Sequence, residues 1–581
     1  MAKISKENKI MSLILKKLKT QLISKNLDGY IVPKNDQFFS EYAYPNRLKI
    51  ISNFSGSAGF AVILRKKNYL FVDGRYSLQA KMQSGRVFKI LTIPNQYPYS
   101  ILKSKKLRIG FYSRVFTENT IKNFFQKTKC DLIPLNIDLV NQIKKKKIKI
   151  KIKKFYKLLD KDSGLSAKFK INRLSNFLSK NKVDLQLITS SENVAWLTNL
   201  RGNDSNYSPL PNSYLIIDKF KRIFLFCNLA KVDSKLKRSL RYIKFLDIKF
   251  IENFLINLTG KKILIDKNTC SIFFKIMLNK NNKLIEKNDP IYYFKSKKNK
   301  TEIQNSIKSH IHDGVALTKF IFWLKDNYKK KKICEIKAQN KLFNFRKKSK
   351  FFKGPSFPTI SGTRSNGSII HYRASKKTNK LLKDGDIYLV DSGGQYKFGT
   401  TDVTRTLSLD NSSSKIKKIY TSVLKGHIAV TNFTLKSNTI GSNIDDAARA
   451  PLKRINLDYP HGTGHGVGYF LNVHEGPIAF SKKNKVNLSE GMIISNEPGY
   501  YENGKFGIRI ENLIYVKKRK NKIYFKNLTM APLEKSLIDR DMLNIKEKLW
   551  INNYHNEVYN NLKKFMNSKE LLKLKSHCSN I

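Results

Sequence analysis

Five side chains that could bind metal ions lie in the C-terminal half of the sequence, at the ends of short β-rich runs or in glycine-rich turns. They are Asp391, Asp402, His465, Glu497 and Glu511. Carboxylates combined with one imidazole suit a pair of divalent ions such as Mn²⁺. Two such ions about 3.5–4 Å apart can bridge and ionise a water molecule and polarise a carbonyl group. The set therefore predicts a two-metal hydrolytic site, although each residue alone has an ordinary structural explanation.

The first two carboxylates lie on a predicted β-hairpin. An apolar run, Ile387–Val390, leads into Asp391, and the chain returns through Asp402. If the turn is centred on Tyr396-Lys397, the two aspartates are directly opposed, with Cβ atoms about 4.5–5.5 Å apart. Carboxylates that close repel each other unless a cation or a shared proton lies between them. A bulge in either strand would break this register.

The other candidate residues follow in glycine-rich and alternating segments. Glycine at every other position of His461–Gly468 leaves the imidazoles unobstructed and lets the backbone pass close to a neighbour. His474 follows nine residues after His465, and Glu497 precedes a Pro-Gly turn. Period-2 alternation places Arg509 on the same strand face as Glu511.

A weak internal repeat indicates how the preceding chain is organised. Gln21–Pro33 and Phe177–Thr189 each read as the end of an amphipathic helix, a Ser-Lys-Asn turn and a strand. Two related α/β domains in tandem would explain this pattern. The alternative is that any helix–turn–strand unit looks alike.

Two polar segments suggest domain boundaries. Lys144–Lys157 alternates Ile and Lys, which is typical of a protected edge strand or of a solvated linker. A second polar run lies at Ser296–Lys300, before a helix predicted over Thr301–Lys325 with Thr301 and Gln304 as its capping box. Two histidines of this helix, His310 and His312, are predicted to be surface or supporting residues. The predicted domains are 1–160, 161–297, 298–535 and 536–581.

The composition is strongly basic, with 112 Lys and Arg against 43 Asp and Glu, and a net charge of +69. Such a charge is typical of proteins that bind nucleic acid or anionic membranes. Here the lysines are spread over nearly every segment, which favours a general compositional drift over a binding patch. No RNP-like motif or basic helix with interleaved aromatic residues supports RNA or lipid binding. We expect no specific nucleic-acid partner and no membrane partner.

The five cysteines are scattered and odd in number, which is typical of reduced intracellular thiols. The N-terminus has no uninterrupted apolar segment of the signal-peptide kind, and no run of about 18 apolar residues is present. These features predict a cytoplasmic protein.

Several motifs resemble the pita-bread metallopeptidases, the group of methionine aminopeptidase, prolidase, creatinase and aminopeptidase P. The closest similarity is to the long, three-domain aminopeptidase P type, with two creatinase-like N-terminal α/β domains before the catalytic domain. The motifs that carry it are SFPTIS, IIHY, VDSGGQYKFGTTDVTRT, HGTGHGVGYFLNVHEGP, NEPGYYENGKFGIRIEN and WINNYH in residues 356–555, and SGSAG, FVDGRY and AWLTNLRG upstream. A Lys-Ile run replaces the family's acidic and aromatic connector before the second domain.

The resemblance implies a metallo-aminopeptidase that uses a two-metal-activated hydroxide to hydrolyse the N-terminal Xaa-Pro bond of peptides. It implies Mn²⁺ dependence and a homodimer. It also implies a role for each site residue. Asp391 binds one metal, Asp402 and Glu511 bridge both, His465 and Glu497 bind the second, Glu497 also takes a proton, His371 and His474 orient the peptide, His461 lines the proline pocket, and Arg509 supports Glu511.

Two other functions are compatible with the sequence. A prolidase-type enzyme would cut Xaa-Pro dipeptides only, and the two N-terminal domains argue against it. A pita-bread domain that has lost its metals could serve as a binding module, but all five positions here hold metal-binding residue types.

Overall fold

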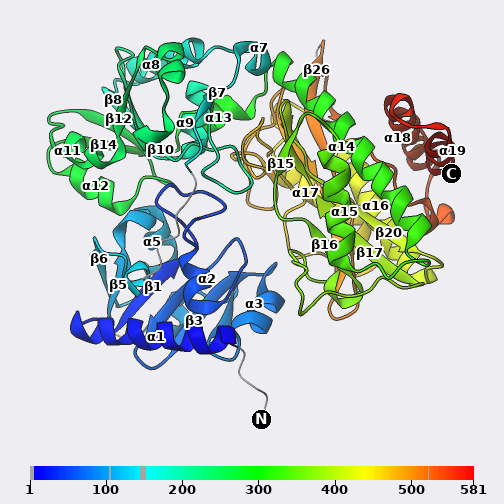
Figure 1. The fold of residues 1–581 in the computed structure, drawn as a ribbon, viewed down its shortest axis with the longest axis horizontal. Coiled ribbons are helices and arrows are strands. Elements are labelled where there is room, and N and C mark those ends of the chain that lie inside the picture. Colours follow the sequence, from blue (N-terminus) through cyan, green and yellow to red (C-terminus); the bar gives the residue numbers. More distant parts are fainter. Residues whose placement is uncertain (1–5, 104–105, 144–151, 521) are drawn as a thin grey trace. The chain divides into compact units, whose positions relative to one another are not determined.

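The computed structural model describes residues 6–103, 106–143, 152–520 and 522–581. Two compact units are present: unit 1 comprises Met1–Asp160 and Leu165–Ile291, and unit 2 comprises Lys161–Gly164 and Tyr292–Ile581 (Figure 1). Each mixes helices with sheets, as the α/β prediction required. Within the described ranges, no helix combines the length and apolarity needed to cross a membrane.

Unit 1 contains two six-stranded sheets with flanking helices. The first has the strand order β4-β3-β2-β1-β5-β6, and the second has the order β12-β11-β10-β8-β13-β14. The strands are β1 (Gly29–Pro33), β2 (Phe60–Leu64), β3 (Asn68–Asp73), β4 (Lys89–Ile93), β5 (Arg108–Tyr112), β6 (Asp131–Leu135), β8 (Leu185–Ile188), β10 (Ser213–Asp218), β11 (Ile223–Cys227), β12 (Ile243–Asp247), β13 (Lys262–Asp266) and β14 (Lys283–Lys287). Its main helices are α1 (Lys6–Ser24), α2 (Arg47–Ser52), α3 (Ser77–Ser84), α4 (Pro98–Leu102), α5 (Glu118–Phe125), α6 (Leu139–Ile143), α8 (Ala167–Lys180), α9 (Ser191–Thr198), α10 (Ser234–Ser239), α11 (Ile251–Ile256) and α12 (Ile272–Asn279). Helices α7 (Asp160–Ser163) and α13 (Pro290–Ser296) each include residues assigned to both units.

The two sheets share one topology, which confirms the tandem repeat. In each, a central strand that follows a long helix pairs antiparallel with one neighbour and parallel with the other, as β1 does with β2 and β5 and β8 does with β10 and β13. All residues of β1 and β8 are buried. Strands covered on both faces read as continuous apolar runs, so the repeat was visible in the sequence.

The Lys-Ile run lies partly outside the described residues, which resume at residue 152. Its last two residues form β7 (Tyr156–Lys157), which pairs antiparallel with β9 (Leu200–Arg201). A short strand therefore closes this segment, and the part at 144–151 stays a prediction.

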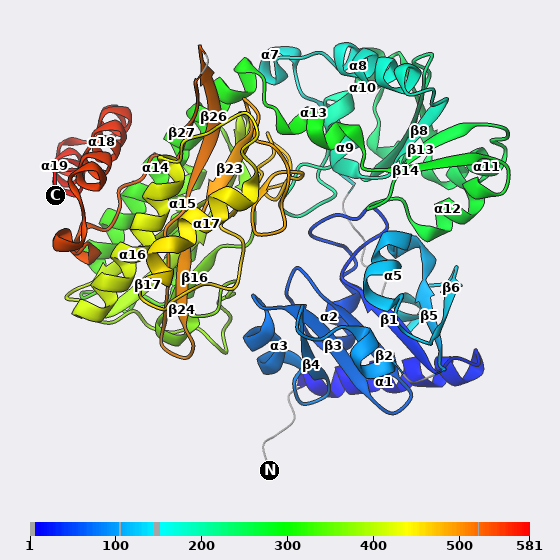
Figure 2. The same ribbon diagram turned by 180° about the vertical axis from the view of Figure 1, so that it is seen from behind.

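Unit 2 carries the segments with the candidate metal ligands. Its helices are α14 (Lys300–Asn327), α15 (Glu335–Lys347), α16 (Ser414–Thr431), α17 (Gly441–Lys453), α18 (Ile545–Leu562) and α19 (Ser568–His577). Its strands are β15 (Phe352–Pro355), β16 (Ile360–Thr363), β17 (Asp386–Ser392), β18 (Gly394–Tyr396), β19 (Gly399–Thr400), β20 (Val403–Leu409), β21 (Gly464–His465), β22 (Ala479–Phe480), β23 (Ile493–Asn496), β24 (Gly499–Glu502), β25 (Phe506–Arg509), β26 (Asn512–Arg519) and β27 (Lys522–Asn527). Figure 2 shows α16 and α17 in front of strands of this unit, with α18 and α19 together at its edge.

Several apolar clusters stabilise unit 2, and two of them pack against strands near the candidate ligands. One lies between α14, α15 and the hairpin β17–β20, and includes Leu317, Leu342 and Val390. The other joins α16 to β25 and the C-terminal helices, and includes Leu424 and Val558. The C-terminal segment therefore shares a core with the strands that carry the candidate ligands.

Helix α14 begins one residue before the predicted start, and its capping box differs from the predicted one. Asn299, not Thr301, accepts a hydrogen bond from the Glu302 amide, and the Glu302 carboxylate accepts one from the Asn299 amide. Asn299 also donates to the Ser163 carbonyl at 2.8 Å. The prediction was wrong because the side chain that folds back on the helix precedes the Lys-Thr pair. His310 of this helix is buried, with Nδ1 2.7 Å from the Ser306 carbonyl oxygen, so it is not a surface residue.

Replacing Asn299 by Ala removes the cap and the bond to Ser163. We expect a loss of about 1 kcal/mol in unfolding free energy, since a lost N-cap typically costs ~0.5–2 kcal/mol. Urea unfolding followed by far-UV circular dichroism measures it. Asn279→Ala, near the end of α12, should stay close to wild type, and equal effects of the two changes would contradict the capping role.

Candidate metal centre

The hairpin that carries the two aspartates has a register different from the predicted one. Asp391 pairs with Thr404, and Ser392 with Val403. The turn lies at Lys397-Phe398, because Tyr396 pairs with Gly399 in the small sheet formed by β18 and β19. Asp402 therefore lies just before β20 instead of directly opposite Asp391. The predicted register was wrong because the turn is one residue later along the chain than was assumed.

Four of the five predicted ligands nevertheless lie close together. Ligand atoms of Asp402, His465 and Glu511 all lie within 4.8 Å of one another. The His465 Nε2 atom is 3.5 Å from an oxygen of Asp402 and 3.5 Å from an oxygen of Glu497. Asp391 joins them through Arg509, whose guanidinium lies 2.6 Å from Asp391 Oδ2. The hairpin and three later segments thus contribute to one cluster.

Gly464 allows the strand that carries His465 to approach the strand that leads to Glu497. A Cβ atom on Gly464 would lie 1.9 Å from the Ser495 carbonyl oxygen, so only glycine fits where β21 passes β23. The His465 amide donates to Ser495 Oγ at 2.9 Å, and that hydroxyl donates to Glu497 Oε1 at 3.0 Å. This close backbone approach is what the alternating glycines of the sequence indicated.

The electrostatics of the cluster fit a bound cation. Burial, followed by the neighbouring carboxylates, raises the pKa of Asp402 and of Glu511 well above the usual range. Oδ1 of Asp391 is buried and has no hydrogen-bond partner among the described residues. Several crowded carboxylate oxygens, one of them unpaired, form an arrangement that divalent ions stabilise. The residues present therefore fit a metal pair.

A hydrogen-bond network connects the cluster to His461. Arg509 donates to Asp391 and to Thr404 Oγ1 at 3.0 Å, and that hydroxyl donates to Glu511 at 2.7 Å. Arg509 also donates to Tyr501 Oη at 2.6 Å, and His461 Nε2 lies 2.9 Å from the same hydroxyl. Arg509 thus contacts Asp391 directly and reaches Glu511 through Thr404. The sequence pattern did not reveal Tyr501.

The remaining predicted histidines differ in what they contact. His474 is exposed, and its ring centroid lies 4.2 Å from that of His465. The two rings are brought together because the Glu475 amide donates to the Gly466 carbonyl at 2.7 Å. His371 is half-buried in a turn after the short helix η4 (Arg364–Asn366).

Arg405 is a fully buried residue that the sequence did not single out. Its guanidinium donates to the carbonyls of Thr404, Glu511, Ala531 and Pro532, to Asn512 Oδ1 and to Tyr554 Oη. Arginine can offer five N–H donors in a fixed planar geometry. Arg405 therefore connects the segments that carry Asp402 and Glu511 to the C-terminal helix α18.

Comparison with known proteins identifies the family. The metallopeptidase family M24 model matches residues 305–518, and the model of the C-terminal region of peptidase M24 matches residues 522–581. Two creatinase/prolidase N-terminal domain models match residues 14–140 and 146–302. A probable Xaa-Pro aminopeptidase P of Laccaria bicolor is 35% identical over 97% of this chain and 93% of its own length. The chain belongs to metallopeptidase family M24.

Other M24 relatives agree with this assignment. Xaa-Pro aminopeptidase 1 of Dictyostelium discoideum is 35% identical over 94% of this chain and 92% of its own length. The crystal structure of X-prolyl aminopeptidase from Caenorhabditis elegans, described as a cytosolic enzyme with a di-nuclear active site, is similar with a TM-score of 0.94. It is 27% identical, and the match covers 98% of this chain and 100% of that chain. The predicted resemblance, fold class and metallo-aminopeptidase function are thereby confirmed.

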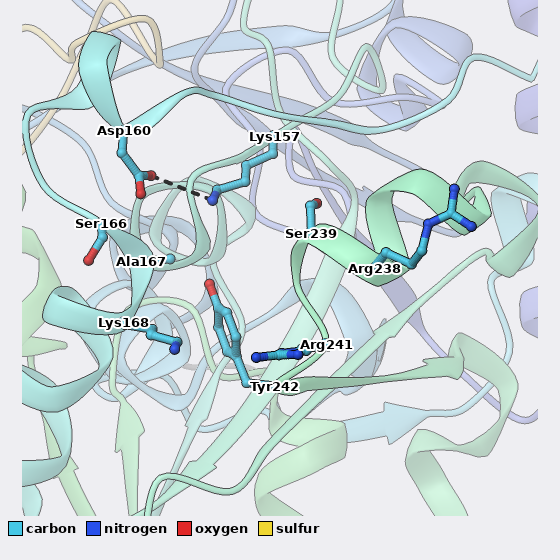
Figure 3. Close-up of a pocket in the computed structure, with 9 residues that line it drawn as sticks. All are labelled: Lys157, Asp160, Ser166, Ala167, Lys168, Arg238, Ser239, Arg241 and Tyr242. Atoms are coloured by element: carbon cyan, nitrogen blue, oxygen red, sulfur yellow. Dashed lines mark ion pairs between the residues drawn. The ribbon is translucent and has the colours of Figure 1, made fainter.

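The M24 chain also has a basic pocket in unit 1, away from all the predicted site residues in the sequence. It is lined by Lys157, Asp160, Ser166, Ala167, Lys168, Arg238, Ser239, Arg241 and Tyr242. Lys157 Nζ lies 3.6 Å from Asp160 Oδ1, and Figure 3 shows the Arg238 side chain extending away from the others. The cationic groups do not converge on one point, and we assign no site there.

Proposed function

We propose that this chain removes the N-terminal residue from peptides whose second residue is proline. The observation that carries the proposal is the convergence of Asp402, His465 and Glu511, with Glu497 3.5 Å from the same imidazole. The names of the relatives support the Xaa-Pro specificity.

Each ligand has a proposed place around two divalent ions, which we take to be Mn²⁺. Asp391 would hold one ion, His465 and Glu497 the other, and Asp402 and Glu511 both. When bound, the ion pair supplies an acidified water and neutralises negative charge that develops on the scissile carbonyl oxygen. The di-nuclear site of the C. elegans relative supports this assignment.

The chain's own groups would move the proton and hold the peptide. Glu497 is the least buried carboxylate of those beside His465, with 18% of its side chain exposed, and the Ser495 hydroxyl orients it. We assign to Glu497 the proton taken from the attacking water. His371 and His474 are proposed to orient the scissile peptide and to donate hydrogen bonds to it.

His461 is proposed to line the pocket that receives the proline ring. Its Nδ1 lies 2.8 Å from the Gly462 carbonyl and must donate there, which leaves Nε2 to accept from the Tyr501 hydroxyl. Both ring nitrogens are therefore occupied. The amide nitrogen of an Xaa-Pro bond belongs to proline and carries no hydrogen. A site that needs no hydrogen bond from this nitrogen tolerates proline, and a pocket shaped for the ring favours it.

The remaining expectations about the whole protein are part of this proposal. The domains are proposed to run over 1–160, 161–297, 298–535 and 536–581, and the family-model matches support a similar division. We propose that the enzyme is cytoplasmic, as the C. elegans relative is described, and homodimeric. Peptides with proline at the second position are its proposed partners.

A substrate panel tests the specificity. Rates on an Xaa-Pro-Yaa tripeptide, on the Xaa-Pro dipeptide and on an Xaa-Ala-Yaa tripeptide are measured with Mn²⁺ present. We expect kcat/KM for the proline tripeptide to exceed that for the alanine tripeptide about 10²-fold. The proposed pocket fits the shape of the proline ring and does not require an N–H donor from the scissile amide. A faster rate on the dipeptide would instead establish a prolidase. No hydrolysis and no bound metal would establish a binding module.

A further inference from the structure

We infer that Glu335 is a positioning residue that holds the segment carrying His371 in its working conformation. This inference rests on the proposed function, because it assigns His371 to the peptide-orienting role given above. Glu335 is the first residue of α15 and is fully buried. It lies far from the candidate ligands in the sequence.

The carboxylate of Glu335 accepts hydrogen bonds from four residues of one later segment. Oε1 accepts from the Thr363 amide at 2.9 Å, and Oε2 accepts from the Lys380 amide at 3.0 Å. The Asn366 side-chain amide lies 3.0 Å from both oxygens, and the Tyr372 hydroxyl donates to Oε2 at 2.9 Å. These partners bracket His371 on both sides, and Tyr372 is its immediate neighbour.

The backbone of Glu335 holds the same segment. Its carbonyl accepts from the Ser361 hydroxyl at 2.8 Å, and its amide donates to the Lys380 carbonyl at 3.0 Å. The next residue, Ile336, donates its amide to Asn379 Oδ1 at 3.0 Å. Both ends of residues 361–380 are therefore tied to one turn of helix.

A carboxylate suits this task because it only accepts hydrogen bonds. The Thr363 and Lys380 amides and the Asn366 NH₂ group can only donate, so they need acceptors. A buried donor left without an acceptor costs about 1–3 kcal/mol. These hydrogen bonds therefore stabilise one conformation of residues 361–380 relative to conformations in which the donors lack acceptors.

Helix capping does not explain Glu335. A capping side chain binds amides of its own helix. Here all four of the partners named above for the carboxylate lie outside α15, in residues 363–380. The carboxylate thus acts on the segment and not on the helix end.

The segment also contacts the strand that carries Arg509. A Cβ atom on Gly507 would lie 2.0 Å from the Gly367 carbonyl oxygen, so β25 passes directly against the start of the segment. At the other side, Ile360 pairs with Asp391 across β16 and β17. Residues 360–367 are thus fixed against two site strands. The hydrogen bond from Tyr372 to Glu335 also fixes the part of the segment next to His371.

The experiment compares Glu335→Gln with Glu302→Gln in the Mn²⁺-loaded enzyme. Glu302 is a second buried carboxylate that accepts a backbone amide bond, in the capping box of α14. The amide introduced by Glu335→Gln would place an NH₂ group against a donor. We expect Glu335→Gln to lower kcat about 10–100-fold, the range typical of residues that orient a functional group. Bound Mn²⁺ per chain should stay at the wild-type value, and Glu302→Gln should change kcat less than about 3-fold.

A double-mutant cycle separates positioning from general damage. If Glu335 acts through His371, adding Glu335→Gln to His371→Ala should lower the residual kcat less than about 3-fold, because coupled residues are non-additive. Tyr372→Phe, which removes one donor and keeps the ring, provides the same cycle if Glu335→Gln does not fold.

The inference is overturned if Glu335→Gln lowers kcat by the same factor in wild type and in His371→Ala, or if Glu335→Gln loses bound metal. Unchanged kcat in Glu335→Gln also overturns it. Inactivity of the wild-type enzyme on Xaa-Pro peptides would overturn the proposed function instead.

Discussion

Replacing Glu497 by Gln is expected to lower kcat for an Xaa-Pro-Yaa peptide about 10³-fold or more. The substitution keeps the size of the side chain and its contact with Ser495, but it removes the group to which we assign the water proton. A positioned general base typically contributes about 10²–10⁴-fold, and loss of a ligand charge adds to the effect. Initial rates at saturating peptide and Mn²⁺ measure the change.

Glu502→Gln is the matched control for this variant. Glu502 ends β24, five residues after Glu497, and its carboxylate pairs with Lys415 and Lys505 instead of the cluster. We expect its kcat to remain within about 2-fold of wild type. Wild-type hydrolysis by the Glu497→Gln enzyme would refute the catalytic assignment.

Replacing Asp402 by Asn is expected to have opposite effects on stability with and without metal. Burial and the neighbouring carboxylates raise the pKa of Asp402, so its charge is unfavourable in the metal-free fold. Asparagine removes that repulsion, and the metal-free variant should melt at a higher temperature than the metal-free wild type. With Mn²⁺ the order should reverse, because a ligand at 100 times its Kd stabilises a protein by about 2.7 kcal/mol and the variant lacks one of the proposed metal-binding carboxylates.

Thermal melts with chelator and with added Mn²⁺ measure both effects, together with metal per chain and activity. We expect bound metal to fall below two ions per chain in Asp402→Asn, and kcat to fall at least about 10³-fold. Asp410→Asn is the control, since Asp410 follows β20 on the surface and pairs with Lys329. If Mn²⁺ raises the melting temperature of Asp402→Asn as much as that of wild type, Asp402 is not a ligand.

Much of the fold and most of the ligand cluster could be predicted because their signals are local. The repeated helix–turn–strand units and the apolar strands identified two similar sheets. The glycines around His465 indicated a close backbone approach, and Gly464 provides it against Ser495. Alternation placed Arg509 beside Glu511 on one face, and the structure links them through Thr404.

Other features depend on contacts that no sequence period encodes. The register of Asp391 depends on where one hairpin turns, and a shift of one residue in the turn moved its partner to Thr404. The Tyr501 and Arg405 hydrogen bonds join residues of separate strands, and the Glu335 carboxylate accepts from the Thr363 amide, 28 residues later in the chain. Such partners become visible only when the strands are assembled in space.

The buried guanidinium of Arg405 has a consequence for the 3′ end of the gene. Because it spans Glu511 and Tyr554, a premature stop codon ahead of α18 would remove one of its hydrogen-bond acceptors and open the core shared with α16. Alleles that end there should therefore abolish the enzyme completely instead of behaving as milder truncations.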